Sequence, residues 1–187
     1  MKNDWLPQAM QRCSPHCDAR PPGVEISLIV VHGISLPKGV FGLDHVARLF
    51  LGCLDETAHP SFAGLRDMRV SAHLLIDRQG AITQFCPFSM RAWHAGVSSF
   101  GGRAHCNDFS IGIELEGSDE IPYADIQYAI LAQVCGWLAA VFPTIGHIAG
   151  HADVAPGRKT DPGAAFDWQR LRRELGQESG VLVCGGS

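Results

Sequence analysis

Three residues of this chain combine a side chain of a metal-binding type with a position at the end of an apolar run or on a loop, where functional groups are often found. The sequence holds nine histidines, and His32 directly follows the β-branched run 26–31, at the end of a predicted buried strand. His151 follows a second short apolar run, and Asp161 lies ten residues later on a loop rich in proline and glycine. Two neutral imidazoles and one carboxylate suit a catalytic zinc ion, which takes three protein ligands and leaves a fourth position for water. Spacing alone leaves a second interpretation open, because a histidine at a strand end is also a common hydrogen-bonded structural residue.

Short strands and helices intermingle along the chain and must position these side chains. The segment 109–117 alternates strictly between apolar residues and small or acidic ones, which predicts a strand with one face in the core. The segments 70–76 and 81–85 predict a hairpin, because Gly80 can adopt the positive φ of a tight return. A short helix is predicted in the forties after Asp44, and a last helix marked by Trp168, Leu171 and Leu175 and closed by Gly176.

The longest helix is predicted between Pro122 and Pro143, where apolar residues recur at the three-and-four spacing of an amphipathic helix. The residues that we expect on its apolar stripe are Ile126, Ile130, Val134, Trp137, Leu138 and Val141. Together these elements predict an α/β fold: a single domain with a central mixed β-sheet flanked by helices.

Length and composition bound the classes of function. A chain of 187 residues and 20.2 kDa has room for one core. We expect an irregular N-terminal segment over 1–25 packed on the body, a catalytic domain over 26–176, and a loose tail over 177–187. A net charge of −4 argues against nucleic acid and anionic membrane surfaces as partners. No apolar run predicts a spanning helix or an export signal, and seven scattered cysteines suit the reduced thiols of a cytoplasm.

Four segments carry a more specific pattern. They are 30–32 (VVH), 70–73 (VSAH), 107–117 (NDFSIGIELEG) and 150–163 (GHADVAPGRKTDPG). In this order they resemble the type-2 N-acetylmuramoyl-L-alanine amidases, a family that includes the peptidoglycan recognition proteins, across roughly residues 25–175. The segments 93–99 (WHAGVSS) and 158–163 are most similar to the branch that acts in the cytoplasm on 1,6-anhydro-muropeptides during cell-wall recycling.

The resemblance implies a role for each candidate residue. His32, His151 and Asp161 would bind one zinc ion, Glu114 would be the general base, and Lys159 would stabilise developing negative charge. The chain departs from the pattern after the first ligand, because Gly33 stands where close relatives usually have asparagine. This departure puts in doubt a substrate contact at that position, but not the ligand itself.

The chemistry of amide hydrolysis agrees with these roles. Glu114 projects from the polar face of its strand, where a carboxylate could take the proton of a water and pass it to the departing amine. Glu116 shares this face but lies about 6–7 Å farther along the strand, so we expect it to have a supporting or structural role. Lys159 lies two residues before Asp161 and could reach the same pocket, although a lysine on a loop is otherwise simply solvated.

Three aromatic side chains complete the candidates. Trp93 and His94 lie in a loop flanked by glycine, where they could offer a sugar a stacking surface and a polar contact; Trp93 would serve equally well as a core residue. His73 lies within a predicted strand, and we expect it to be an internal, hydrogen-bonded histidine.

These observations predict a monomeric, cytoplasmic zinc amidase with one zinc ion and a small soluble muropeptide as its substrate. The enzyme would cut the bond between the lactyl group of (1,6-anhydro-)N-acetylmuramic acid and the L-alanine of the stem peptide. Two alternatives remain open at this point: a non-catalytic peptidoglycan-binding module on the same fold, and an exported amidase that acts on the intact cell wall.

Overall fold

A seven-stranded mixed sheet forms the centre of the computed structural model, which describes residues 4–176 and 180–186. Its strand order is β1-β5-β4-β9-β3-β10-β11, and its strands are β1 (Met10–Gln11), β3 (Leu28–Ile34), β4 (Leu74–Ile76), β5 (Ile82–Gln84), β9 (Ser110–Glu116), β10 (His147–Gly150) and β11 (Leu182–Val183). Only β4 and β5 pair antiparallel within it. The prediction of a single α/β domain with a mixed sheet flanked by helices is therefore confirmed, and so is the hairpin, with shorter strands than expected.

Helices and short two-stranded ribbons surround this sheet. The α-helices are α1 (His45–Phe50), α2 (Asp125–Val141), α3 (His151–Val154) and α4 (Trp168–Leu175). The ribbons are formed by β2 (Cys17–Ala19) with β6 (Met90–Ala92) and by β7 (Ser99–Phe100) with β8 (Arg103–Ala104). Single 3-10 turns occur at η1 (Glu56–Ala58), η2 (Pro60–Phe62) and η3 (Cys106–Asp108). The last helix ends at Gly176, as predicted.

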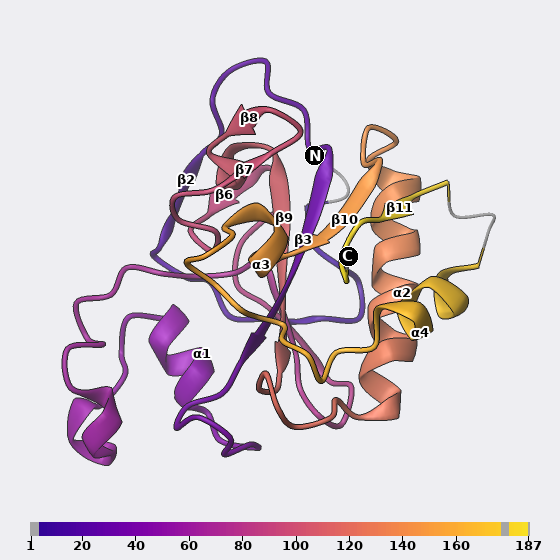
Figure 1. Ribbon diagram of the computed structural model, residues 1–187. Helices are drawn as coiled ribbons and strands as arrows, with labels where there is room; N and C mark the ends of the chain where they lie inside the picture. Colours follow the sequence, from indigo (N-terminus) through magenta and orange to yellow (C-terminus); the bar gives the residue numbers. More distant parts are fainter. Residues whose placement is uncertain (1–3, 177–179, 187) are drawn as a thin grey trace.

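The two faces of the sheet have different coverings. Helices α2 and α4 lie side by side against one face and build the main core with the apolar residues of β9 and β3 (Figure 1). Helix α1 lies on the opposite side (Figure 1), where it packs on Leu75 and Phe85. Residues 4–176 and 180–186 contain no helix that is both long and apolar enough to cross a membrane.

Helix α2 presents to the core a stripe that matches the predicted one in part: Val134 and Leu138 are buried, and Ile130 and Trp137 are partly buried and pack against the core. Its fully buried positions are Gln127, Tyr128, Leu131, Ala132, Val134, Cys135 and Leu138. Ile126, by contrast, is 44% exposed. The stripe is rotated because polar Gln127 is drawn inward: its side-chain amide donates to the carbonyls of Ile76 and Glu116, at the ends of β4 and β9.

Both ends of the chain add short strands that the sequence did not predict. The segment 1–25 was expected to be irregular, but β1 joins the sheet edge beside β5 and β2 pairs with β6. The tail over 177–187 was expected to be loose, but β11 pairs with β10. Strands of two or three residues gain their order from the neighbour that they pair with, since they are too short to carry a pattern of their own. Residues 1–3, 177–179 and 187 lie outside the described part of the chain.

Alternation along β3 places one polar side chain in the middle of an apolar face. On the side away from α2, Leu28 and Val30 pack with α3, while Ile34 packs with the cluster around α1. His32 lies between these two clusters and is only 1% exposed. The sheet therefore holds this imidazole at a fixed place, with apolar packing on both sides along the strand.

Candidate metal centre

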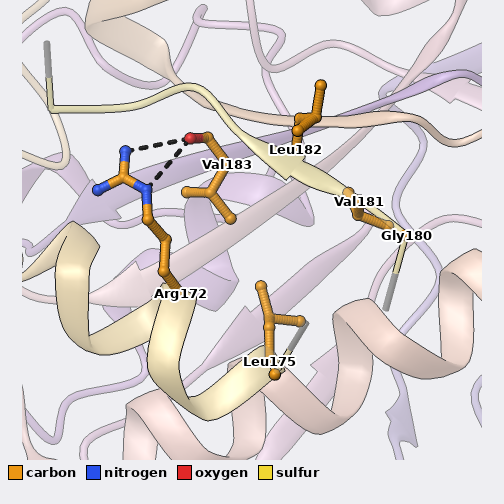
Figure 2. A pocket seen from close by; sticks show the side chains of 7 residues that line it. Arg172, Leu175, Gly180, Val181, Leu182 and Val183 are labelled. Atoms are coloured by element: carbon orange, nitrogen blue, oxygen red, sulfur yellow. Dashed lines mark hydrogen bonds between the residues drawn. The ribbon is translucent and has the colours of Figure 1, made fainter. Parts of the chain in front are cut away.

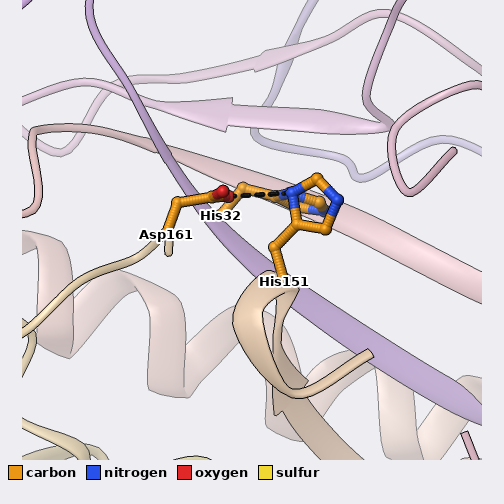
Figure 3. Close-up of side chains that lie close together, drawn as sticks. All are labelled: His32, His151 and Asp161. Atoms are coloured by element: carbon orange, nitrogen blue, oxygen red, sulfur yellow. Dashed lines mark hydrogen bonds and ion pairs between the residues drawn. The ribbon is translucent and has the colours of Figure 1, made fainter. Parts of the chain in front are cut away.

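Three neighbouring parallel strands bring the candidate residues together. In the register of β3 and β9, His32 lies beside Glu114. In the register of β3 and β10, Gly150 lies beside Val31, so that His151 follows as the first residue of α3. Asp161 comes from the loop after α3, whose path is fixed by a hydrogen bond from the Ala152 amide to the Asp161 carbonyl. Figure 3 shows the three side chains of His32, His151 and Asp161 converging from a strand, a short helix and this loop.

The converging atoms form a small triangle. His32 Nδ1 lies 2.9 Å from His151 Nδ1, and these two nitrogens lie 3.2 and 3.0 Å from Asp161 Oδ2. Ligand atoms bonded at about 2.0–2.1 Å to one tetrahedral zinc ion lie about 3.3–3.4 Å apart, so a small outward movement of these three atoms would fit them to the ion. Within the described residues, this is also the single group of three or more such side chains that could hold a metal ion.

The hydrogen bond at the far side of the His151 ring indicates which nitrogen is directed at the triangle. Its Nε2 lies 3.2 Å from the carbonyl oxygen of Ala95. A carbonyl only accepts, so Nε2 donates this hydrogen bond and Nδ1 is the ring nitrogen directed at the triangle. Burial, followed by the neighbouring His151, lowers the pKa of His32 to about 4, which keeps this ring neutral as a ligand must be. The donor set therefore fits zinc.

Glu114 lies beside this triangle with one oxygen unused. Its side chain is 8% exposed, and its Oε2 atom is buried with no hydrogen-bond partner. Burial and then the charge of Asp161 raise the pKa of Glu114 well above its usual value, and the charge of Lys159 opposes this shift. A buried carboxylate oxygen without a partner costs folding free energy, so its presence at this place points to a proton-transfer role.

Glu116 is engaged elsewhere. Its Oε1 accepts a hydrogen bond of 2.5 Å from the Gly42 amide, and its Oε2 accepts one of 3.4 Å from the Arg78 amide. These bonds tie β9 to two loops, which is the structural role that the sequence suggested for this residue.

Lys159 lies at the open side of the centre. It is exposed and lines a cavity of about 260 Å³ together with Asp161, Thr160 and Gly33. The Thr160 hydroxyl donates to Asp119 Oδ2 across this cavity, which holds the loop between Lys159 and Asp161. Lys159 and Asp161 therefore line the same cavity.

Trp93 and His94 occupy different surroundings. The half-buried Trp93 donates from Nε1 to Asp18 at 3.1 Å and stacks on His16, with ring centroids 6.2 Å apart. His94 lies behind His32, with its Nδ1 2.9 Å from His32 Nε2 and its Nε2 3.2 Å from the Ser110 hydroxyl. The sugar contact expected of Trp93 stays a prediction, whereas both ring nitrogens of His94 are already engaged inside the protein.

His73 is an internal histidine, as expected. It is fully buried, its Nδ1 accepts from the Gly112 amide at 3.0 Å, and its Nε2 lies 3.1 Å from both the Met90 carbonyl and the Arg20 guanidinium. Sequence reasoning missed this half-buried arginine, which also donates to carbonyls of residues 88, 107, 108 and 110. Nothing in the irregular lead-in marked Arg20, since its partners are backbone oxygens of distant residues.

Gly33 has a steric reason to lack a side chain. A Cβ atom at this position would lie 2.0 Å from the Tyr123 hydroxyl oxygen. That hydroxyl donates at 2.9 Å to the carbonyl of Pro162, the residue after Asp161. In this chain, Tyr123 thus fills the space beside the first candidate ligand, and it holds the backbone next to the third.

Gly33→Ala is expected to lower the free energy of unfolding by about 1–3 kcal/mol, the usual cost of overpacking. The matched control is Gly136→Ala inside α2, where a Cβ would meet nothing within 4 Å. This control should raise the free energy of unfolding by about 0.5–1 kcal/mol through helix propensity. Urea unfolding of both variants measures the difference, and equal stability of the two would contradict the close packing of Tyr123 on Gly33.

A second cavity lacks comparable chemistry. It has a volume of about 400 Å³, lies between α4 and β11, and shares no lining residue with the cavity at Lys159 (Figure 2). Among the described residues that line it, Arg172 is the one with a charged side chain. Its guanidinium donates hydrogen bonds to the carbonyls of Val183 and Gly185. The described lining of this cavity therefore offers no group of metal-binding side chains like that at His32.

The mixed sheet thus brings together two histidines and an aspartate that could hold a metal ion, with a buried glutamate beside them. Residues 22–164 match the model of the N-acetylmuramoyl-L-alanine amidase family, and the chain belongs to this family.

Individual relatives extend the comparison. The chain is 55% identical over 169 residues to the 1,6-anhydro-N-acetylmuramyl-L-alanine amidase AmpD of Citrobacter freundii, covering 90% of each chain. A crystal structure of a selenomethionine derivative of AmpD superposes with a TM-score of 0.90 at 53% identity, covering 93% of this chain and 98% of the other. The Escherichia coli amidase AmiD, solved in complex with its substrate anhydro-N-acetylmuramic acid-L-Ala-D-gamma-Glu-L-Lys, matches with a TM-score of 0.55 at 29% identity, over 83% of this chain and 60% of AmiD.

Proposed function

We propose that this chain hydrolyses the amide bond between the lactyl group of 1,6-anhydro-N-acetylmuramic acid and the L-alanine of a stem peptide, as a step of peptidoglycan recycling. The high identity to AmpD over nearly the whole of both chains supports the anhydro-muropeptide as substrate. The observation that carries the proposal is the triangle of His32, His151 and Asp161, with the unpartnered Glu114 oxygen beside it.

His32 and His151 would hold one zinc ion through Nδ1, and Asp161 through Oδ2. When bound there, zinc supplies a Lewis acid that makes a water nucleophilic near neutral pH and polarises the scissile carbonyl. All other groups that the reaction needs come from the chain.

Glu114 moves the proton. Its free Oε2 takes one proton from the attacking water as the bond between the water oxygen and the carbonyl carbon forms. The same atom returns that proton to the nitrogen of L-alanine as the carbon–nitrogen bond breaks, so that the products are a peptide amine and a lactyl carboxylic acid, which then releases its proton to water. The raised pKa of Glu114 suits a group that must first accept a proton and then donate it near neutral pH.

Lys159 stabilises the negative charge that develops on the carbonyl oxygen. Lys159 lines the cavity shared with Asp161, its charge acts on Glu114, and a positive donor placed there would act mainly on the transition state. The exposed position of Lys159 lets its long side chain approach a substrate that covers the cavity.

The chain would act in the cytoplasm, as a monomer, on a small soluble muropeptide. We propose no contact with nucleic acid or membrane, in keeping with the net charge of −4. Trp93 is proposed as a surface for the sugar ring.

The decisive experiment incubates the purified protein with anhydro-N-acetylmuramyl-L-Ala-D-γ-Glu-L-Lys and follows the products by mass spectrometry, with zinc content measured on the same sample. We expect one zinc ion per chain, release of free tripeptide, and loss of both after chelation. Retained binding of the muropeptide without cleavage would instead indicate a binding module. Faster cleavage of intact cell wall than of the soluble fragment would indicate a wall amidase.

A further inference from the structure

His94 makes a contact that the proposed catalytic steps do not use. Its ring lies edge-on to that of His32, with centroids 5.0 Å apart and planes at 87°. The atoms in contact are His94 Nδ1 and His32 Nε2, at 2.9 Å. This is the nitrogen of His32 that faces away from His151 and Asp161.

The direction of this hydrogen bond follows from the next residue in the network. The hydroxyl of Ser110 has one proton, which it donates at 2.6 Å to the carbonyl oxygen of Cys106. The Ser110 oxygen can therefore only accept from His94 Nε2, 3.2 Å away. A neutral His94 with its proton on Nε2 has a bare Nδ1, which accepts from His32 Nε2. His32 in turn has a bare Nδ1, directed at the triangle.

We infer that His94 is a positioning residue: it accepts a hydrogen bond from His32 and so fixes the tautomer of that ring whose Nδ1 can bind the metal. The inference rests on the proposed ligand role of His32. It assigns His94 a task different from the substrate contact expected from the sequence.

The fold is shaped to keep His94 in this place. A Cβ atom at Gly112 of β9 would lie 2.4–2.6 Å from atoms of the His94 ring. The ring can therefore pack against β9 only because residue 112 has no side chain. The backbone amides of His94 and Ala95 both donate to Asn107 Oδ1, at 3.2 and 2.8 Å. Ring and backbone are thus held independently of His32.

The same loop also orients the second histidine. The carbonyl of Ala95, the next residue, accepts from His151 Nε2 at 3.2 Å. Two consecutive residues therefore select the tautomers of both candidate histidine ligands, one through a ring nitrogen and one through a backbone oxygen. Such outer partners of metal ligands commonly change metal affinity by about 10–100-fold when they are removed.

The test compares His94→Leu with His94→Asn. The two replacements have nearly the same shape, but only asparagine offers an oxygen near the position of Nδ1. Zinc dissociation constants are measured by competition with a chelator on folded protein, as judged by circular dichroism. We expect the leucine variant to bind zinc about 10–100-fold more weakly than the unchanged protein and the asparagine variant to recover most of this loss. Equal affinity of all three proteins, or equal weakening in both variants, would overturn the inference.

Asp161→Ala separates this inference from the proposed function. If it abolishes zinc binding while His94→Leu leaves the affinity unchanged, the ligand set stands and the role of His94 is wrong. If zinc binding survives Asp161→Ala, the ligand set itself is wrong.

Nitrogen NMR of the zinc-loaded, unmutated protein gives a second readout that needs no variant. We expect the ring protons of His32 and His94 both to reside on Nε2. A proton on Nδ1 of His94 would reverse the hydrogen bond and overturn the inference.

Discussion

Glu114→Gln is expected to lower turnover of the anhydro-muropeptide by about 10²–10⁴-fold, the usual contribution of general acid–base catalysis, while zinc content stays at one ion per chain. The amide keeps the shape of the side chain but cannot accept the proton of the water. The loss should appear in kcat more than in KM, because proton transfer occurs in the transition state. Steady-state kinetics and metal analysis of the same preparation provide both measurements.

Glu116→Gln is the matched control, since this residue lies on the same face of β9 but accepts from the amides of Gly42 and Arg78. We expect its turnover to remain within a few-fold of that of the unchanged protein, as for most changes outside the reacting groups. If Glu114→Gln were as active as the unchanged protein and Glu116→Gln were not, the base would have to be assigned to Glu116.

Asp161→Ala is expected to remove zinc and activity together, with turnover falling by at least about 10³-fold because the water loses its metal activation. Removal of the carboxylate leaves two of the three atoms of the triangle. Metal content after dialysis and turnover at saturating substrate test this expectation.

Asp119→Ala is a control for the loss of a carboxylate in the same cavity. Asp119 accepts from the Thr160 hydroxyl and lies outside the triangle, so this variant should retain its zinc. An Asp161→Ala protein with a full complement of zinc would show that the ion is bound elsewhere.

The main elements of the fold could be predicted because their own residues carry a pattern. Strand β9 was recognised from the alternation of residues 109–117, and α4 from its apolar spacing and from Gly176. Strands β1, β2 and β11 have two or three residues each, and their order comes from pairing partners far away in the sequence. The core-facing stripe of α2 was predicted only in part: Val134 and Leu138 are buried, but hydrogen bonds of Gln127 draw this polar residue inward while Ile126 is exposed.

The candidate site could be predicted only in part, because contacts between residues far apart in the sequence also shape it. His32, His151 and Asp161 were named from their residue types and their family resemblance, and the structure brings them together. The surroundings of His94 were not predictable, because its ring contacts His32, Ser110 and Gly112, which are all distant from it in the sequence. A linear pattern identifies reactive side chains, but it does not show which of their atoms are already occupied.

The position of the ligands along the chain has a consequence for biosynthesis. His32 and Glu114 lie on β3 and β9, which are translated before β10, whereas His151 and Asp161 follow β10 in the sequence. Before residue 161 has emerged from the ribosome, the nascent chain can bring together at most two of the three candidate ligands. The complete set of candidate ligands therefore comes together only after the loop that carries Asp161 has emerged and β10 has paired with β3.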